Sequence, residues 1–270
     1  MRPLRIAAIS LLVLYAAFTA YVSLGPLLGL PTVHGKSVPW LTLIATAFAI
    51  THAFTYIGWR KTFILFALTY IVSLLFESVG VATGWIYGPY HYTEQLGPRF
   101  LGLVPYLIPL AWFMISYPSL VIAEVVIGYR APEAKWRSLR VAALAAVVMT
   151  ACDLVLDPIM VKMGHWVWEI EGAYFGVPLH NYLGWLVTTF SIFILYKWAT
   201  GRQTHKIREP SDQSFLLLAS GSYASTVAGN TLAALQMGLI GPALIGFFGA
   251  GAFALLSLFN LGGGRSSKRD

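Results

Sequence analysis

Three carboxylates lie in stretches of sequence that are otherwise apolar. Glu77 follows the run ILFALTYIVSLLF, and Asp153 and Asp157 lie within ACDLVLDPIM. A carboxylate that faces lipid costs roughly 3 kcal/mol or more. We therefore expect all three side chains to face the interior of a helix bundle or a water-filled cavity. The i, i+4 spacing of Asp153 and Asp157 places both on one face of a helix.

Two carboxylates this close in a medium of low dielectric cannot both ionise easily, so one of the pair is expected to hold a proton near neutral pH. A buried carboxylic acid can act as a general acid. A structural alternative remains open. Asp157, which directly precedes Pro158, would cap the following turn, and Asp153 would pair with a basic or histidine side chain of a loop.

Three kinds of chemistry use such a site. DLVLD superficially resembles the Asp-rich motif of membrane prenyltransferases, but a second such motif and basic residues to bind a diphosphate on the same side are lacking. Ion or proton transport uses buried acids. Acid catalysis on an apolar substrate would protonate an isolated C=C beside aromatic faces that stabilise a carbocation. The residues alone do not choose between transport and acid catalysis.

The elements that must position these acids are membrane helices. The chain has 270 residues, of which 57% are hydrophobic and only 11% charged, against about 25% charged in soluble domains. This predicts an all-α integral membrane protein, a bundle of about eight transmembrane helices that forms one polytopic domain over residues 1–270. The predicted spans are about 6–28, 40–58, 62–84, 102–128, 139–157, 179–199, 214–235 and 240–261. The apolar run of the first predicted span is longer than the apolar core of a signal peptide, so we expect this segment to cross the membrane.

The positive charge follows the membrane topology. All of the 18 basic residues except Lys36, Arg99 and Lys162 lie at the two termini or in the loops after the second, fourth and sixth spans. This bias predicts cytoplasmic termini and an even number of spans, so the net charge of +7 does not indicate nucleic-acid binding. The lone cysteine, Cys152, excludes an internal disulfide and a cysteine-based metal cluster.

Two outer loops combine Trp, Tyr, His and Glu, which indicates a functional role for these loops. Alternatively, their aromatic residues form a belt at the membrane interface. They are GWIYGPYHYTEQLGPRFLG (84–102) and MGHWVWEIEGAYFGVPLHN (163–181). Glu77 and Asp157 are each followed by a glycine seven residues later and then by aromatic residues. The two units predict a parallel internal repeat of spans 3–4 and 5–6, in which both acids face one cavity.

Several other residues allow more than one interpretation. Pro105 and Pro109 in the fourth span are expected to bend or break the helix. The bend would either open a lateral entrance for a lipid-soluble substrate or be a plain kink. Glu124 is expected near Arg130 or its neighbours. His91, His165 and His180 match no standard zinc spacing, which favours hydrogen-bonding roles over a metal site. His52 would face the bundle or bond a backbone carbonyl.

Two long motifs resemble the carotenoid hydratase family of archaea and bacteria, which includes bisanhydrobacterioruberin hydratases and acyclic carotenoid 1,2-hydratases. They are ESVGVATGWIYGPYHYTEQLGPRFLGLVPYLIPLAW (77–112) and DLVLDPIMVKMGHWVWEIEGAYFGVPLHNYLGW (153–185). The resemblance covers about residues 60–200, which would form the catalytic core. It implies addition of water, without cofactor or metal, across a terminal C=C of a long acyclic polyene with a C50 or C40 skeleton, giving a tertiary alcohol.

The resemblance implies roles for the acids and their neighbours. Asp153 or Asp157 would protonate the alkene, and Glu77 or the other aspartate would orient the water. Arg99 would tune Glu94 or Glu169. Residues expected to surround the substrate and the water are Trp85, Tyr87, Tyr90, His91, Tyr92, Arg99, Trp112, Trp166, Trp168, Glu169, Tyr174, His180, Asn181 and Trp185.

The expected partners are a lipid-soluble carotenoid, the bilayer and other membrane enzymes of the same pathway, with no nucleic acid. The expected location is the cell membrane, with the site in the outer half of the bilayer. Two alternatives stay open: a proton- or ion-coupled transporter, and a carotenoid-binding subunit without catalytic activity.

Overall fold

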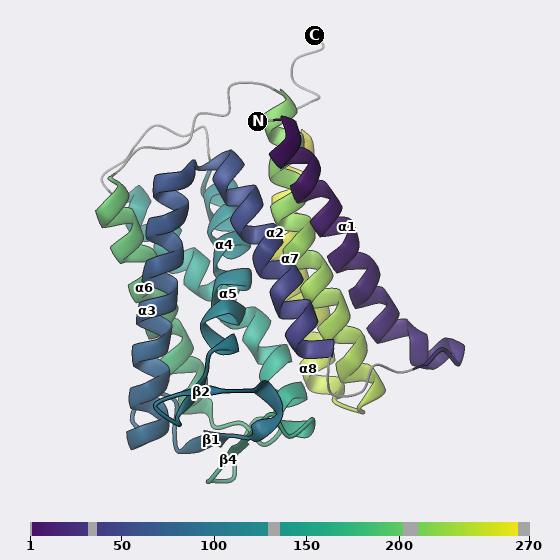
Figure 1. Cartoon of the computed structure of the whole chain (residues 1–270), viewed down its shortest axis with the longest axis vertical. Coiled ribbons are helices and arrows are strands. Elements are labelled where there is room, and N and C mark those ends of the chain that lie inside the picture. Colours follow the sequence, from purple (N-terminus) through teal and green to yellow (C-terminus); the bar gives the residue numbers. More distant parts are fainter. Residues whose placement is uncertain (1, 32–36, 129–135, 202–209, 264–270) are drawn as a thin grey trace.

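Long apolar helices form most of the computed structural model, which describes residues 2–31, 37–128, 136–201 and 210–263 (Figure 1). Within these ranges, seven helical segments are long and apolar enough to cross a membrane, which confirms the all-α, multi-pass prediction. The helices are α1 (Arg2–Leu24), α2 (Ser37–Tyr56), α3 (Trp59–Thr83), α4 (Leu107–Ile127), α5 (Arg137–Lys162), α6 (Leu179–Thr200), α7 (Pro210–Gln236), α8 (Ile240–Ile245) and α9 (Gly251–Gly263). A 3-10 turn, η1 (Gly25–Leu28), extends α1, and a π-helical turn, η3 (Gly246–Ala250), joins α8 to α9.

Seven of the eight predicted spans coincide with these apolar segments. The predicted span 214–235 forms α7, but it is not among the seven. Its many Ser, Thr and Gly residues keep the mean hydropathy of α7 below the level that the seven segments reach. Whether α7 crosses the membrane, the side on which the termini lie and the internal repeat all stay predictions.

The fourth span begins later than predicted. Residues before Leu107 turn back on themselves, because β2 (Arg99–Phe100) pairs antiparallel with β3 (Val104–Pro105). Pro105 therefore lies ahead of α4, and Pro109 lies in its first turn, where a proline ring breaks no helical hydrogen bond. The prediction that these prolines bend the fourth span is wrong. The proline inside α4 is Pro118.

The fifth span ends later than predicted. Helix α5 continues through Pro158 to Lys162, so Asp157 lies inside the helix and does not cap a following turn. This places both aspartates of α5 within the bundle, about one turn apart on the same face.

The two aromatic loops meet at the end of the bundle opposite the start of α1 (Figure 1). Strand β1 (Tyr90–Tyr92) of the first loop pairs antiparallel with β4 (Trp166–Trp168) of the second, with Tyr90 opposite Trp168. A short 3-10 turn, η2 (Glu94–Leu96), follows β1. Because side chains alternate along a strand, Tyr90 and Tyr92 are buried and His91 is exposed. The paired loops close the end of the bundle with aromatic rings.

Helix α4 is the central helix, with most of its residues buried between α2, α3, α5 and α7. On one side of the bundle, α3, α4, α5 and α6 surround the acids. On the other, α1, α2 and α7 pack together (Figure 1). His52 connects these parts, because Nδ1 lies 2.6 Å from Tyr117 Oη and Nε2 lies 2.7 Å from Phe215 O. Both interpretations of His52 thus hold: it faces the bundle and bonds a backbone carbonyl.

Candidate functional site

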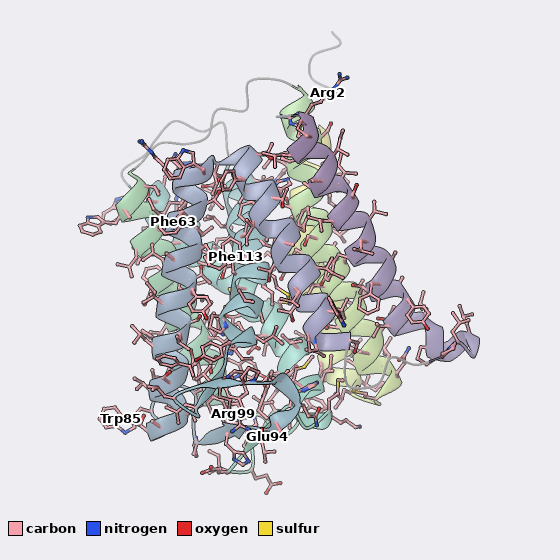
Figure 2. The ribbon with its side chains drawn as sticks, in the orientation of Figure 1. Arg2, Phe63, Trp85, Glu94, Arg99 and Phe113 are labelled. Atoms are coloured by element: carbon pink, nitrogen blue, oxygen red, sulfur yellow. The ribbon has the colours of Figure 1, made fainter. Side chains whose placement is uncertain are left out.

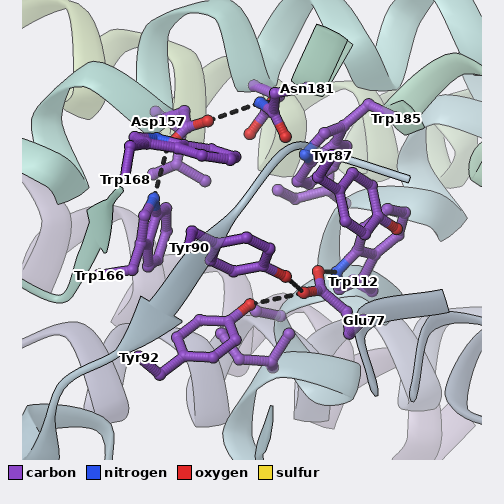
Figure 3. A pocket seen from close by; sticks show the side chains of 15 residues that line it. Glu77, Tyr87, Tyr90, Tyr92, Trp112, Asp157, Trp166, Trp168, Asn181 and Trp185 are labelled. Atoms are coloured by element: carbon purple, nitrogen blue, oxygen red, sulfur yellow. Dashed lines mark hydrogen bonds between the residues drawn. The ribbon is translucent and has the colours of Figure 1, made fainter. Parts of the chain in front are cut away.

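The three intramembrane acids converge on one pocket beneath the paired loops (Figure 3). Glu77 is 4% exposed, Asp153 1% and Asp157 2%, so none of them faces lipid. The pocket encloses about 60 Å³. The predicted site residues that line it are Glu77, Tyr87, Tyr90, Tyr92, Trp112, Asp153, Asp157, Trp166, Trp168, Asn181 and Trp185.

Glu77 receives three hydrogen bonds and makes no ion pair among the described residues. Tyr90 and Tyr92 both donate to Oε2, the latter at 2.8 Å, and Trp112 Nε1 donates to Oε1 at 3.1 Å. Burial, and then the neighbouring Glu77, raises the pKa of the Tyr90 and Tyr92 hydroxyls well above their usual value. Both tyrosines therefore keep their protons and act as donors. Three donors with no acceptor suit an ionised carboxylate.

Asp157 has a similar environment, whereas Asp153 does not. Trp166 Nε1 donates to Asp157 Oδ1 at 2.6 Å, and Asn181 Nδ2 donates to Asp157 Oδ2 at 2.6 Å. The same amide nitrogen lies 3.3 Å from Asp153 Oδ2. Asp153 Oδ1 is buried and has no hydrogen-bond partner in the described part of the chain. Among the described residues Asp153 thus pairs with neither a basic residue nor a histidine, contrary to the structural alternative.

Aromatic rings form the walls of the pocket. Trp112 from α4 and Trp185 from α6 stack with ring centroids 4.1 Å apart. Tyr87 lies between α3 and α6, with its hydroxyl 2.9 Å from Thr188 Oγ1. Glycines on both helices make room for this ring: a Cβ at Gly80 would lie 2.7 Å from it, and one at Gly184 would lie 2.6 Å from it.

Six of the predicted substrate-contacting residues lie outside the pocket. Trp85 is 80% exposed and points away from the bundle (Figure 2). Arg99 forms a 2.6 Å ion pair with Glu94, which is one of the two partners expected for it. The other expected partner, Glu169, lies 3.4 Å from His91 instead. The six are Trp85, His91, Arg99, Glu169, Tyr174 and His180. Tyr174 donates to Leu154 O at 2.9 Å, beneath the second loop.

The lining also includes four apolar residues that the sequence interpretation missed: Ile108, Ala111, Ile115 and Leu156. Three of them lie on α4 at positions i, i+3 and i+7, and Trp112 occupies position i+4 on the same helix face. With Trp112 already predicted at the site, this spacing was a usable signal. Leu156, which directly precedes Asp157, is the fourth apolar side chain of the lining.

The remaining polar predictions have mixed outcomes. His165 is buried, and neither of its ring nitrogens has a partner among the described residues, so its predicted hydrogen-bonding role is wrong. Burial lowers the pKa of His165, which keeps the ring neutral. Glu124 forms an ion pair with Lys197, and Arg130 lies outside the described residues. In those residues no group of three or more His, Cys, Asp or Glu side chains could hold a metal ion.

The fold and the pocket define a multi-pass helical membrane protein with a buried site built from carboxylates and aromatic rings. The chain belongs to the carotenoid biosynthesis protein family, which matches residues 37–252 and so includes every pocket residue. This confirms the resemblance drawn from residues 77–112 and 153–185.

One curated relative is the bisanhydrobacterioruberin hydratase of Haloarcula japonica, to which the chain is 36% identical over 168 residues. The match covers 62% of this chain and 53% of the relative, so the chain spans about half the length of that protein. No solved structure matches the chain.

Proposed function

We propose that this protein is a carotenoid hydratase, which adds water across a terminal C=C of a long acyclic polyene to give a tertiary alcohol. Membership of the carotenoid biosynthesis family and the name of the hydratase relative support the substrate class and the reaction. The observation that carries the proposal is the unequal hydrogen bonding of three buried acids. Glu77 and Asp157 are surrounded by donors, and one oxygen of Asp153 has no partner among the residues that the structure describes.

Asp153 is the general acid in this proposal. A buried Oδ1 with no partner among the described residues suits a protonated carboxyl group, whose O–H needs no acceptor from the protein when a substrate is present. Asp153 transfers this proton to the less substituted carbon of the C=C. A C–H bond forms, the π bond breaks and the adjacent carbon becomes a tertiary carbocation.

The surrounding groups stabilise this cation. The faces of the stacked Trp112 and Trp185 rings offer negative electrostatic potential to a cation. Glu77 and Asp157 add negative charge that is already oriented by fixed donors, so little reorganisation is needed as the cation develops.

Asp157 is the base that receives the proton of the water. As the water oxygen bonds to the cation, its proton passes to Asp157, and the product is a tertiary alcohol. Asp153 and Asp157 lie about one turn apart on the same face of α5, so the proton returns from Asp157 to Asp153 directly or through a water in the pocket. The reaction transfers no electrons, so it requires neither an oxidant nor a reductant.

We further infer that the pocket lies in the outer half of the cell membrane, where it would meet its lipid-soluble substrate and other enzymes of the pathway. The described basic residues Arg2, Arg60, Lys61, Arg137 and Lys197 lie at the starts of α1, α3 and α5 and near the end of α6. The aromatic loops lie at the opposite end (Figure 1). Basic residues favour the cytoplasmic side.

The direct test is mass spectrometry of the polyene after incubation with the purified protein, without oxygen or added cofactor. C40 and C50 polyenes with a terminal C=C are both offered. We expect a gain of one water per reacting end, lost in Asp153→Asn and kept in Glu94→Gln, whose carboxylate is 93% exposed. Bound but unchanged polyene with the wild-type protein would favour a binding subunit. Uptake driven by an ion gradient would favour a transporter.

A further inference from the structure

A second cavity adjoins the acid pocket. It encloses about 100 Å³ and lies between α1, α2, α4, α5 and α7, on the side of the bundle away from Glu77. Four residues line both cavities: Ile108, Ala111, Leu156 and Trp166. These side chains are therefore a shared wall, and Trp166 also bonds Asp157. We call this space the second chamber.

The acid pocket alone is too small for a polyene. Pockets that enclose small ligands usually measure about 300–1,000 Å³, whereas the acid pocket encloses about 60 Å³. It has room for the branched end of a chain and a water. The rest of the chain must leave through a wall of the pocket, and the wall shared with the second chamber is formed by three aliphatic side chains and one indole.

The second chamber is apolar apart from a few groups on α1, α2 and α7. Tyr15 and Thr226 satisfy each other through a 2.7 Å hydrogen bond. Asn230 Nδ2 is buried and lacks a hydrogen-bond partner among the described residues. A buried amide donor left unpaired is destabilising, because its lost hydration is not replaced by a hydrogen bond. A ligand with an oxygen acceptor would remove this cost.

We propose that the second chamber binds the segment of the isoprenoid chain that directly follows the end in the acid pocket, and that Asn230 donates a hydrogen bond to an oxygen on that segment. The identity of the ligand rests on the proposed function. The chamber thus distinguishes long chains from short ones, and oxygenated chains from pure hydrocarbons.

Chain length is tested with Val38→Phe, because Val38 lines the second chamber and not the acid pocket. The probes are an acyclic C40 polyene, whose Kd is measured by absorbance titration in lipid nanodiscs, and a five-carbon branched alkene with the same terminal C=C, whose Kd is measured by displacement of the polyene. We expect Kd for the C40 polyene to rise about tenfold or more, consistent with the cost of an overpacked site, and Kd for the short alkene to stay the same. Leu41→Phe serves as a second variant at the same chamber. Val187→Phe, at a half-exposed position on α6, is the control and should change neither probe.

The oxygen contact is tested with Asn230→Leu, which keeps the volume and removes the donor. Binding of a C40 hydrocarbon polyene and of its hydroxylated counterpart is followed by absorbance titration in lipid nanodiscs. We expect about tenfold weaker binding of the hydroxylated chain only, the loss typical of one hydrogen bond. Equal weakening of both polyenes, or of neither, would overturn the role of Asn230.

The role of the second chamber would be overturned if Val38→Phe and Leu41→Phe affected the long and the short probe equally. It would also be overturned if they affected neither probe. Because binding is measured separately from turnover, the proposed function can fail on its own. Polyene binding that depends on chain length and on Asn230, with no water gained by the wild-type protein, would refute hydration and leave the second chamber as a binding site.

Discussion

Asn181 on α6 donates a 2.6 Å hydrogen bond to Asp157 on α5, and the same nitrogen reaches Asp153 at 3.3 Å. One amide therefore contacts both acids of the pair while supplying its closer bond to only one of them. This asymmetry distinguishes the two aspartates chemically, although both lie on the same helix face. It is the basis for assigning Asp153 as the acid and Asp157 as the base.

Replacing Asn181 with Leu should impair turnover more than binding. The substitution removes the donor that Asp157 shares with Asp153, and a hydrogen bond to a charged group contributes about 1.5–3 kcal/mol. We expect the rate of water addition to fall by roughly 10- to 100-fold, with polyene binding by absorbance titration nearly unchanged. His180→Leu, at the exposed neighbouring position, is the control. A loss of binding equal to the loss of rate would show that Asn181 holds the substrate instead.

The tyrosines that bond Glu77 predict how stability depends on pH. The pKa values of Tyr90 and Tyr92 are raised well above 10 in the folded protein, whereas an unfolded tyrosine titrates near pH 10. Below pH 10 both states hold these protons, so the contribution to stability is constant. Above pH 10 the unfolded state releases them first, and the free energy of unfolding falls as the pH rises.

This dependence can be measured as the melting temperature in detergent between pH 8 and 11. Tyr90→Phe and Tyr92→Phe should each lower the melting temperature at pH 8, because Glu77 loses a donor, and each should flatten the decline above pH 10. Tyr106→Phe, outside the pocket, should leave the decline as it is. A decline of unchanged slope in the double variant Tyr90→Phe/Tyr92→Phe would contradict this account.

The sequence predicts the helices well and the loops poorly, for a physical reason. Hydropathy measures how much apolar surface a segment can bury, and this located seven apolar helical segments to within a few residues at most ends. It does not report strand pairing between distant loops. The pairing of Tyr90 with Trp168 depends on a contact between two segments far apart in the chain, and no local pattern encodes it.

The same limit explains the outcome at the site. The acids and most of the aromatic residues were predictable, because an ionisable group in an apolar segment needs a buried environment. Whether the side chain of each loop residue faces the pocket or the solvent was not predictable. His91 lies between two buried tyrosines on β1 and is exposed only because strand side chains alternate. The free oxygen of Asp153 depends on the exact placement of Asn181, which spacing does not determine.

The glycines around Tyr87 predict where the pocket tolerates no side chain. A Cβ at Gly184 would lie 2.6 Å from the Tyr87 ring, closer than carbon atoms approach, so the ring or the helix must shift. We expect Gly184→Ala to lower the free energy of unfolding by about 1–3 kcal/mol, and to reduce turnover because Tyr87 lines the pocket. Gly221→Ala on α7, where the nearest atom would lie 3.8 Å away, is the matched control for thermal unfolding. Equal stability of the two variants would contradict the expected clash.

The ion pair between Lys197 and Glu124 predicts a difference between single and double substitutions. Both side chains are largely buried, at 9% and 12% exposure, and they join α6 to α4 at the end of the bundle away from the acids. Lys61 also interacts with the Glu124 charge, so removing Lys197 leaves this buried carboxylate less compensated and should cost less than the roughly 3–5 kcal/mol of a fully unpaired buried charge. Lys197→Met should therefore lower the melting temperature, and Lys197→Met/Glu124→Gln should recover part of that loss because the buried carboxylate is replaced by a neutral side chain. The pair of Arg99 and Glu94 is the control, because the Glu94 side chain is 93% exposed and Glu94→Gln should cost at most about 1 kcal/mol. If the double variant is as unstable as the sum of its single variants, the two charges do not interact energetically.

The hydration assay should be unaffected by Lys197→Met at temperatures where the variant stays folded, because neither residue lines the acid pocket.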